Sequence, residues 1–309
     1  LQGPGAHDRR QFDDEYRRGS AARGTGGPLT TLPFSTRSGP SGPERFFLVT
    51  SSRYGRAMQP DSALVAECVP SPNHGERRHG GGPDILLLHY TGMPDTLAAL
   101  RRLCSADAEV AAHYLVFEDG RIVQCVPEAR RAWHAGASRW RDIDDVNSHS
   151  IGVEIANPGH EHGYRDFPSV QIDAVTALAR DILDRHPIRA RDVLAHSDVA
   201  PARKDDPGEK FPWRHLYENG VGQWVEPAAL DTPGETIGPG STAQAVAALQ
   251  QDLRRYGYGI DPTGIFDEQT VQVVRAFQRH FRPARIDAAA DPSTRLTLRR
   301  LLDLSAIRT

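Results

Sequence analysis

The stretch Val193–Trp213, VLAHSDVAPARKDDPGEKFPW, begins as a short apolar run and continues as a polar loop punctuated by proline and glycine. His196 directly follows the apolar run, and Asp206 lies further along the loop. Imidazole and carboxylate groups are both ordinary zinc ligands. A loop that folds back after a strand would bring these two side chains together. The stretch therefore predicts two ligands of a metal site.

A third ligand is expected from the segment Ile85–Gly92, ILLLHYTG. Its four leading apolar residues predict a buried strand. His89 lies at the C-terminal end of that strand, where open α/β sheets place their ligands. A lone histidine there is more often a core or surface residue. Together with His196 and Asp206, however, it gives three protein ligands and leaves a fourth position for water, as in a catalytic zinc site.

Five segments occur in a recognisable order, namely LHYT, AHYLVFEDGRIVQCV, RAWHAG, SIGVEIAN and AHSDVAPARKDDPG. Together they resemble the zinc-dependent N-acetylmuramoyl-L-alanine amidases of the AmpD/AmiD type, relatives of phage amidases and peptidoglycan recognition proteins. The resemblance extends over residues 70–213. It implies three zinc ligands, a catalytic glutamate and a catalytic lysine, at His89, His196, Asp206, Glu154 and Lys204 respectively.

Glu154 also stands out on its own chemistry. The segment Ser150–Asn157 alternates as a strand does, and Glu154 lies between two apolar residues. A carboxylate in such a strand costs free energy unless it is paired or used. Burial would raise its pKa toward the range of a general base. Lys204 is expected to be a fixed cation for the oxyanion of amide hydrolysis, in preference to a surface charge beside Asp205.

Three further side chains are expected to contact substrate: Tyr90, Trp133 and His134. Trp133 and His134 lie beside small residues in RAWHAGASRW, which suits a loop wall that contacts sugar or peptide. Anchoring the loop is an equally good role for Trp133. The resemblance assigns His134 to the substrate groove and not to the zinc. His74 and His79 lie in a loop rich in glycine and arginine and are not expected to be ligands.

The local patterns predict an α/β catalytic domain over residues 57–224, with a mixed central sheet and helices on both faces. Val110–Val126 is typical of a hairpin, and Pro168–His186 has the spacing of a core helix. Another helix is expected to begin near Asp95, with Leu97, Leu100 and Cys104 on its apolar face.

Residues 225–240 are a linker rich in proline and glycine. Residues 241–305 predict three short helices, the last with Leu296, Leu298 and Leu301 on its apolar stripe. The pattern LQxxLxxxGY, followed by TGIFDxxT, is similar to a small peptidoglycan-binding domain that accompanies many wall hydrolases. Such domains more commonly have DGxF where this chain has TGIF.

Residues 1–56 are rich in glycine, arginine, serine, threonine and proline and are expected to be disordered or an extension. Met58 is a candidate natural start. We find no run with the length of a membrane-spanning helix, and Phe46–Thr50 is too short for a signal-peptide core. The three cysteines, Cys68, Cys104 and Cys125, are expected to be buried thiols.

A formal net charge of −3 gives no reason to propose nucleic acid as a partner. The expected cofactor is Zn²⁺, and the expected partner is peptidoglycan or a muropeptide; the sequence does not indicate an oligomeric state. An amidase that cuts between N-acetylmuramic acid and L-alanine is favoured over a non-catalytic recognition protein and over a metallopeptidase. A wall-binding domain favours the periplasm or cell envelope, while a cytoplasmic recycling role stays open.

Overall fold

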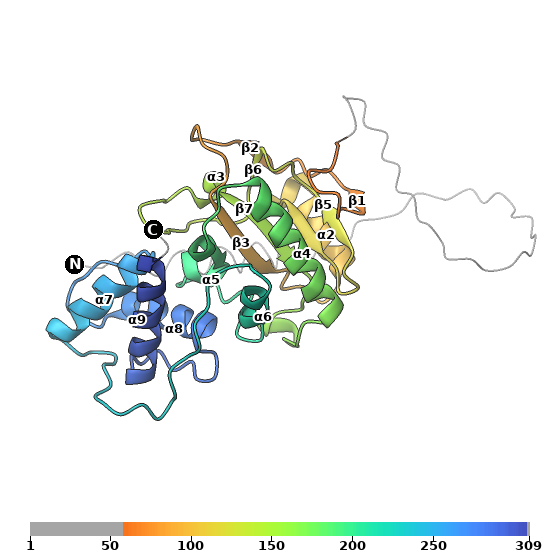
Figure 1. Cartoon of the computed structure of the whole chain (residues 1–309). Helices are drawn as coiled ribbons and strands as arrows, with labels where there is room; N and C mark the ends of the chain where they lie inside the picture. Colours follow the sequence, from red (N-terminus) through yellow and green to blue (C-terminus); the bar gives the residue numbers. More distant parts are fainter. Residues whose placement is uncertain (1–57, 308–309) are drawn as a thin grey trace, which may run out of the picture. The chain divides into compact units, whose positions relative to one another are not determined.

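The computed structural model describes residues 58–307 (Figure 1), so the expectations for residues 1–56 lie outside the described part. The described residues all belong to one compact unit.

A six-stranded sheet forms the centre of this unit, in the order β1-β5-β4-β7-β3-β8. Neighbouring strands run parallel except for the antiparallel pair β4 and β5. The sheet is therefore mixed, as the sequence predicts. In that order the strands are Glu67–Cys68, Ile122–Gln124, Tyr114–Val116, Ser150–Ile155, Ile85–Tyr90 and Val193–Ala195. A separate antiparallel pair joins β2 (His74–Glu76) to β6 (Arg130–Ala132).

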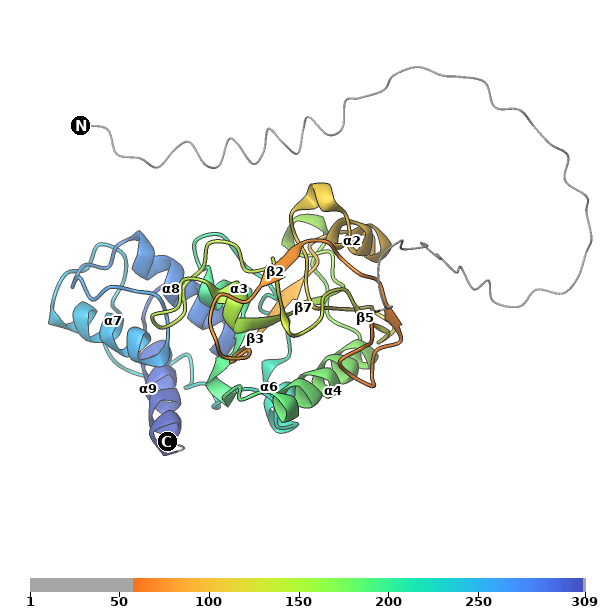
Figure 2. The ribbon, with the colours of Figure 1, turned by 90° about the horizontal axis from the view of Figure 1, so that it is seen from above.

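Helices α2 (Thr96–Leu103) and α4 (Ser169–Arg185) cover opposite faces of the sheet (Figure 2). The alternation of side chains along β4 explains both contacts. Tyr114 belongs to the apolar cluster that contains the buried residues of α4, whereas Leu115 belongs to a second cluster with Leu103 of α2. The prediction of helices on both faces is thus confirmed.

Helix α2 begins where the sequence predicts. The side chain of Asp95 accepts a hydrogen bond from the backbone N–H of Ala98 and caps the helix. The predicted apolar face was wrong at Leu97, which is 52% exposed. Ala99 and Leu103, four residues apart, are the fully buried residues of this helix. The predicted Leu100 and Cys104 are partly buried and pack against the same apolar cluster as Leu103.

The C-terminal part contains the three predicted helices, α7 (Gln244–Tyr256), α8 (Glu268–Phe281) and α9 (Pro292–Ile307), here called the helical module. Leu298 and Leu301 of α9 are buried, but Leu296 is 37% exposed, so its place on the predicted stripe was wrong. Leu296 lies two residues from Leu298, on another side of a helix with 3.6 residues per turn.

One apolar core extends through both parts of the unit, and it includes Leu88 of β3 as well as Leu253 and Phe277 of the helical module. The segment before the module lies along α9. The N–H of Ala228 donates to Thr297 Oγ1 at 3.0 Å, and the hydroxyl of Ser293 donates to the carbonyl of Ala228. Residues 225–240 are therefore held against the last helix.

Short elements complete the fold: α3 (Val146–His149), α5 (His196–Val199), α6 (Trp213–Glu218) and single 3-10 turns at Ala106–Ala108, His160–His162 and Ala190–Asp192. The three cysteines are free thiols, and of these only Cys125 is fully buried. Between residues 58 and 307 no helix has both the length and the apolar character that crossing a bilayer requires.

Candidate active site

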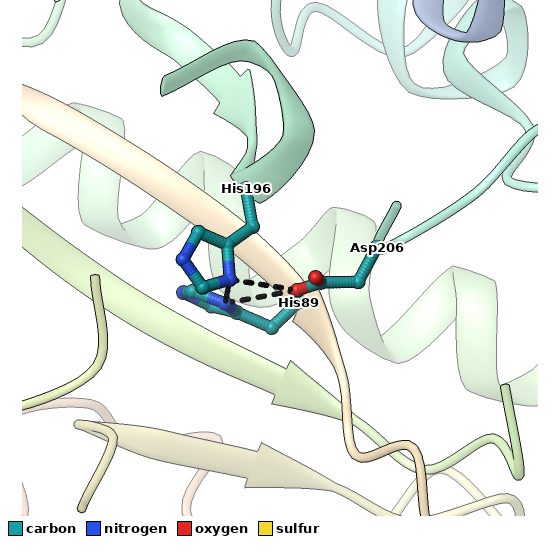
Figure 3. Close-up of side chains that lie close together, drawn as sticks. All are labelled: His89, His196 and Asp206. Carbon is teal, nitrogen blue, oxygen red and sulfur yellow. Dashed lines mark hydrogen bonds and ion pairs between the residues drawn. The ribbon is translucent and has the colours of Figure 1, made fainter. Parts of the chain in front are cut away.

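Three side chains from separate segments converge at the C-terminal end of β3 (Figure 3). His89 comes from that strand, His196 is the first residue of α5 directly after β8, and Asp206 lies on the following loop. His89 Nδ1 lies 2.9 Å from His196 Nδ1 and 3.1 Å from Asp206 Oδ2. His196 Nδ1 lies 3.0 Å from the same carboxylate oxygen. All three residues are buried.

This triangle of ligand atoms fits a single zinc ion. Bonds of about 2.0–2.1 Å at tetrahedral angles place ligand atoms roughly 3.3 Å apart, close to the observed separations. Two imidazoles and one carboxylate are a ligand set that suits zinc, and three protein ligands leave one position for water. Within residues 58–307, this is the group of three histidine, cysteine or acidic side chains that lie close enough to share an ion.

The protonation states also suit metal binding. Burial, reinforced by His196, lowers the pKa of His89 to about 4, so its imidazole is neutral at neutral pH. Burial alone would raise the pKa of Asp206, but the neighbouring His196 and His89 outweigh it and hold that pKa well below the usual carboxyl range. Neutral imidazole and ionised carboxylate are the forms that bind a metal.

The outer nitrogen of each ligand imidazole is also engaged. His196 Nε2 donates to the backbone carbonyl of Ala135 at 3.0 Å. His89 Nε2 lies 3.0 Å from His134 Nδ1. Such partners fix the tautomer and the ring orientation of metal-binding histidines. Both Nδ1 atoms are therefore left to face the metal position.

The contacts of His134 show which way the hydrogen bonds run. The hydroxyl of Ser150 donates to the carbonyl of Val146, so its oxygen is left to accept from His134 Nε2 at 3.2 Å. His134 Nδ1 then carries no proton and accepts from His89 Nε2–H. Burial, with His89 adding, lowers the pKa of His134 well below its usual value, which keeps the ring neutral.

His134 therefore lies behind His89 and not on an open wall of the site. The residue is 6% exposed and both ring nitrogens are engaged; the substrate contact expected of it stays a prediction. Space for the ring depends on Gly152 of β7, because a Cβ atom there would lie 2.5 Å from His134 Cγ. A glycine inside a strand is a signal of such a close approach, and it was the clue to this neighbour that sequence reasoning missed.

Glu154 lies next to the triangle. It is the register partner of His89 across the parallel strands β3 and β7, and paired positions in neighbouring strands point to the same face. Within the described part of the chain, its Oε2 atom is buried and has no hydrogen-bond partner. Burial raises the pKa of Glu154 well above the usual carboxyl range, the charge of Asp206 adds to this, and Lys204 opposes it. A buried carboxyl oxygen without a protein partner suits a group that meets water or substrate.

Lys204 lies half-buried on the loop between the second and third ligands. Its backbone N–H donates to the carbonyl of Ala200 at 3.1 Å. Its charge acts on the pKa values of both Glu154 and His89, so the ammonium group lies near both. Among the described residues its side chain makes no hydrogen bond or ion pair, which leaves the cation available to a ligand.

The other two candidate substrate contacts differ in what surrounds them. Tyr90 is half-buried, and its hydroxyl is 3.0 Å from His160 Nδ1; the charge of Asp206 acts on its pKa. The backbone of Trp133 lies between Ala111 and Asn73, with hydrogen bonds to both. Tyr90 directly follows His89, and Trp133 directly follows β6; the substrate contacts expected of both stay predictions.

Two buried histidines and an aspartate that could hold a metal ion, at the carboxyl end of a mixed sheet and beside Glu154, suit a metal-dependent hydrolase. Residues 79–209 match the N-acetylmuramoyl-L-alanine amidase family, and residues 242–298 match a peptidoglycan binding domain family. AmiD of Escherichia coli, an N-acetylmuramoyl-L-alanine amidase, is 38% identical over 233 residues, which cover 71% of this chain and 82% of AmiD. The 1,6-anhydro-N-acetylmuramyl-L-alanine amidase AmpD of the same species is 35% identical over 48% of this chain and 88% of AmpD.

Solved structures give the same result. The complex of E. coli AmiD with anhydro-N-acetylmuramic acid-L-Ala-D-gamma-Glu-L-Lys has a TM-score of 0.62 at 34% identity and covers 80% of this chain and 93% of that chain. AmpDh3 of Pseudomonas aeruginosa in complex with anhydromuramic pentapeptide has a TM-score of 0.61 at 31% identity, with 74% and 94% covered. The chain belongs to the N-acetylmuramoyl-L-alanine amidase family. The predicted family and enzyme class are confirmed, and the catalytic role is favoured over recognition without cleavage.

Proposed function

We propose that His89, His196 and Asp206 hold one zinc ion and that the chain hydrolyses the amide between the lactyl group of N-acetylmuramic acid and L-alanine. The observation that carries the proposal is the triangle of ligand atoms with sides of 2.9–3.1 Å next to the unpaired carboxyl oxygen of Glu154. The match to the amidase family supplies the substrate class.

Zinc bound to this triangle would polarise the scissile carbonyl and lower the pKa of a bound water. Glu154 accepts the proton of the attacking water, and its raised pKa makes it a base that can hold that proton at neutral pH. The water oxygen bonds to the amide carbon, and the carbonyl oxygen becomes an oxyanion. The ammonium of Lys204 stabilises this charge. The C–N bond then breaks, and Glu154 returns the proton to the amine of L-alanine.

The division of labour along the chain is part of the proposal. Residues 57–224 carry the catalytic site, 225–240 connect, and 241–305 bind the cell wall. The family match over residues 242–298 supports the last role. An enzyme with a wall-binding part acts where polymeric peptidoglycan is accessible, which favours the cell envelope over the cytoplasm. Retention of the purified chain on insoluble sacculi, in the presence of chelator to prevent cleavage, measures the wall-binding role directly.

The substrate assignment is tested by product analysis. Purified zinc-loaded protein is incubated with a soluble muropeptide, and the products are identified by mass spectrometry. An amidase releases an intact stem peptide with a free L-alanine amine and a muramic acid product with a free lactyl carboxylate. Cleavage within the stem peptide would instead identify a metallopeptidase. Binding without products would identify a recognition protein.

Anhydro and intact muramic acid substrates are compared in the same assay. Structures of AmiD and AmpDh3 with anhydromuramic peptides support the proposal that this chain accepts the anhydro form. Equal numbers of turnovers on both forms would show that its site does not distinguish them.

A further inference from the structure

Two adjacent residues of α8 contact the segment 196–206, formed by α5 and the loop after it, which supplies two of the three candidate ligands. His280 Nδ1 lies 2.7 Å from Asp198 Oδ2, and Arg279 Nη2 lies 2.8 Å from Asp205 Oδ1. Asp198 is two residues after the ligand His196, and Asp205 directly precedes the ligand Asp206. The helical module thus contacts this segment close to both candidate ligands, His196 and Asp206.

The carboxylate of Asp198 is the centre of this contact. It is 1% exposed and accepts three hydrogen bonds. One comes from the backbone N–H of Ala195, the residue before the ligand, at 2.8 Å. The other two come from the helical module, from His280 Nδ1–H and from the hydroxyl of Tyr258 at 2.7 Å. The buried carboxylate of Asp198 therefore joins the helical module to the backbone of Ala195, the residue before His196.

Aromatic rings surround this junction. The ring of His280 is stacked at 3.8 Å on Trp213 and at 3.8 Å on Phe281. Tyr258 packs against Trp140 with ring centroids 5.3 Å apart. Hydrogen bonds in such a dry environment are stronger than in water, and a partner left without its bond is costly.

We propose that Asp198, Tyr258 and His280 form a latch of positioning residues through which the helical module holds His196 in its metal-binding orientation. The module is then part of the metal site as well as a wall-binding attachment. This inference rests on the proposed zinc site. The physical reason is that the buried carboxylate of Asp198, if it loses one hydrogen-bond donor, shifts toward a new partner. This shift moves the backbone that carries His196.

The first test uses two buried tyrosines of the helical module in the full-length chain. Tyr258→Phe removes the hydroxyl that donates to Asp198. Tyr256→Phe is the matched control, because that hydroxyl donates to Gln223 Oε1 at 3.2 Å and not to Asp198. Zinc affinity is measured by competition with a chelator. We expect about tenfold weaker zinc binding in Tyr258→Phe, at the low end for changes around ligands, and near wild-type binding in the control.

The second test replaces His280 by two residues of similar shape. His280→Asn keeps a donor near the position of Nδ1, whereas His280→Leu removes it. We expect zinc affinity to fall in the leucine variant and to be rescued in the asparagine variant. The visible spectrum of the Co²⁺-loaded proteins reports ligand geometry directly and should change in the leucine variant alone.

The outcomes separate the latch from a general contribution to folding and from the zinc site itself. Lower melting temperatures of the metal-free variants with unchanged zinc affinity and Co²⁺ spectra would overturn the latch. Equal loss of zinc affinity in Tyr256→Phe would overturn it too, because the effect would not depend on Asp198. If the unaltered protein itself binds no zinc, the proposed metal site is overturned and the latch with it, a result distinct from a failure confined to the variants.

Discussion

His89 and His134 meet edge to face, with ring planes at 89° and a separation of 3.0 Å between His89 Nε2 and His134 Nδ1. On its other side, His134 Nε2 donates to the hydroxyl oxygen of Ser150, and this hydroxyl donates to the backbone carbonyl of Val146. These hydrogen bonds form a series that ends at the backbone carbonyl of Val146, and this final acceptor determines the direction of each bond in the series. A backbone carbonyl can only accept, so the tautomer of His89 is set by the strand and helix behind it.

Gly152→Ala should weaken zinc binding although Gly152 does not touch the metal position. The added Cβ would collide with His134, and the ring would have to leave its place behind His89. Loss of such a partner typically lowers metal affinity or activity by about 10- to 100-fold. Chelator competition measures the effect. Gly75→Ala is the control, because nothing lies within 4 Å of an added Cβ there. Equal zinc affinity in both variants would show that His134 does not support zinc binding by His89.

Removal of any one ligand should abolish stoichiometric zinc binding and amidase activity together. The variants are His89→Ala, His196→Ala and Asp206→Ala, each of which leaves two ligands of the three. Metal content by elemental analysis and turnover of a soluble muropeptide are measured on the same preparations. His74→Ala is the control, since His74 lies on β2 and contacts Arg130. A metal-free His196→Ala protein with normal turnover would rule out the assignment.

Glu128 should make stability depend on pH in a defined window. Burial alone would raise its pKa, but hydrogen bonds from His186, Arg185 and Tyr114 outweigh burial and lower it from 4.5 to about 2. The folded state therefore binds this proton less readily than the unfolded chain does. The stabilisation is complete above pH 4.5 and is lost as the pH falls from there toward 2.

The corresponding variant is Glu128→Gln in metal-free protein. At pH 7 we expect its free energy of unfolding to be lower than that of the unaltered protein by roughly 3 kcal/mol, the value of a shift of this size. The difference should shrink between pH 4.5 and pH 3. Urea denaturation at a series of pH values measures it. A difference that stays constant across this range would show that the carboxylate charge is not what stabilises the fold.

The elements and the three candidate ligands could be predicted because their signals are local. A strand that ends in histidine, a proline-rich loop with an aspartate and a capping residue such as Asp95 each carry their meaning within a few positions. The exposed positions of Leu97 and Leu296 were not predicted, because the face that a short helix buries depends on how it docks and not only on its period.

The residues that hold the candidate ligands in place could not be predicted in this way, because they are distant in sequence. His134 and His89 are 45 residues apart, and Asp198 and His280 are 82 residues apart. No spacing rule connects such pairs, and His134, Asp198 and His280 taken alone are ordinary polar residues of a loop or helix. Only the fold shows that a histidine of the helical module meets an aspartate beside a ligand.

Lys204→Ala should lower the turnover number more than it weakens substrate binding. The charge of Lys204 matters most when the oxyanion forms, so its removal affects the transition state more than the bound substrate. For one well-placed group of this kind the loss is about 10²- to 10³-fold in kcat. Steady-state kinetics on a soluble muropeptide separate kcat from KM. A rise in KM at unchanged kcat would instead make Lys204 a binding residue.

Glu154→Gln should keep both the fold and the metal but lose most of the turnover. The amide has nearly the shape of the carboxylate, yet it cannot accept the proton of the attacking water. Loss of positioned acid–base help typically costs about 10²- to 10⁴-fold in rate. Zinc content, melting temperature and muropeptide affinity should stay near those of the unaltered protein, because Glu154 lies beside the ligand triangle and is not one of its three members.

Two results would be decisive against this role of Glu154. Loss of zinc in Glu154→Gln would make the residue a ligand or a support of one. Near-normal turnover would show that another group takes the proton, and no second acid has its combination of a place beside His89 on the neighbouring strand, a buried oxygen without a partner among residues 58–307, and a raised pKa. Because glutamine preserves shape while removing basicity, the measured rate reports the proton transfer itself.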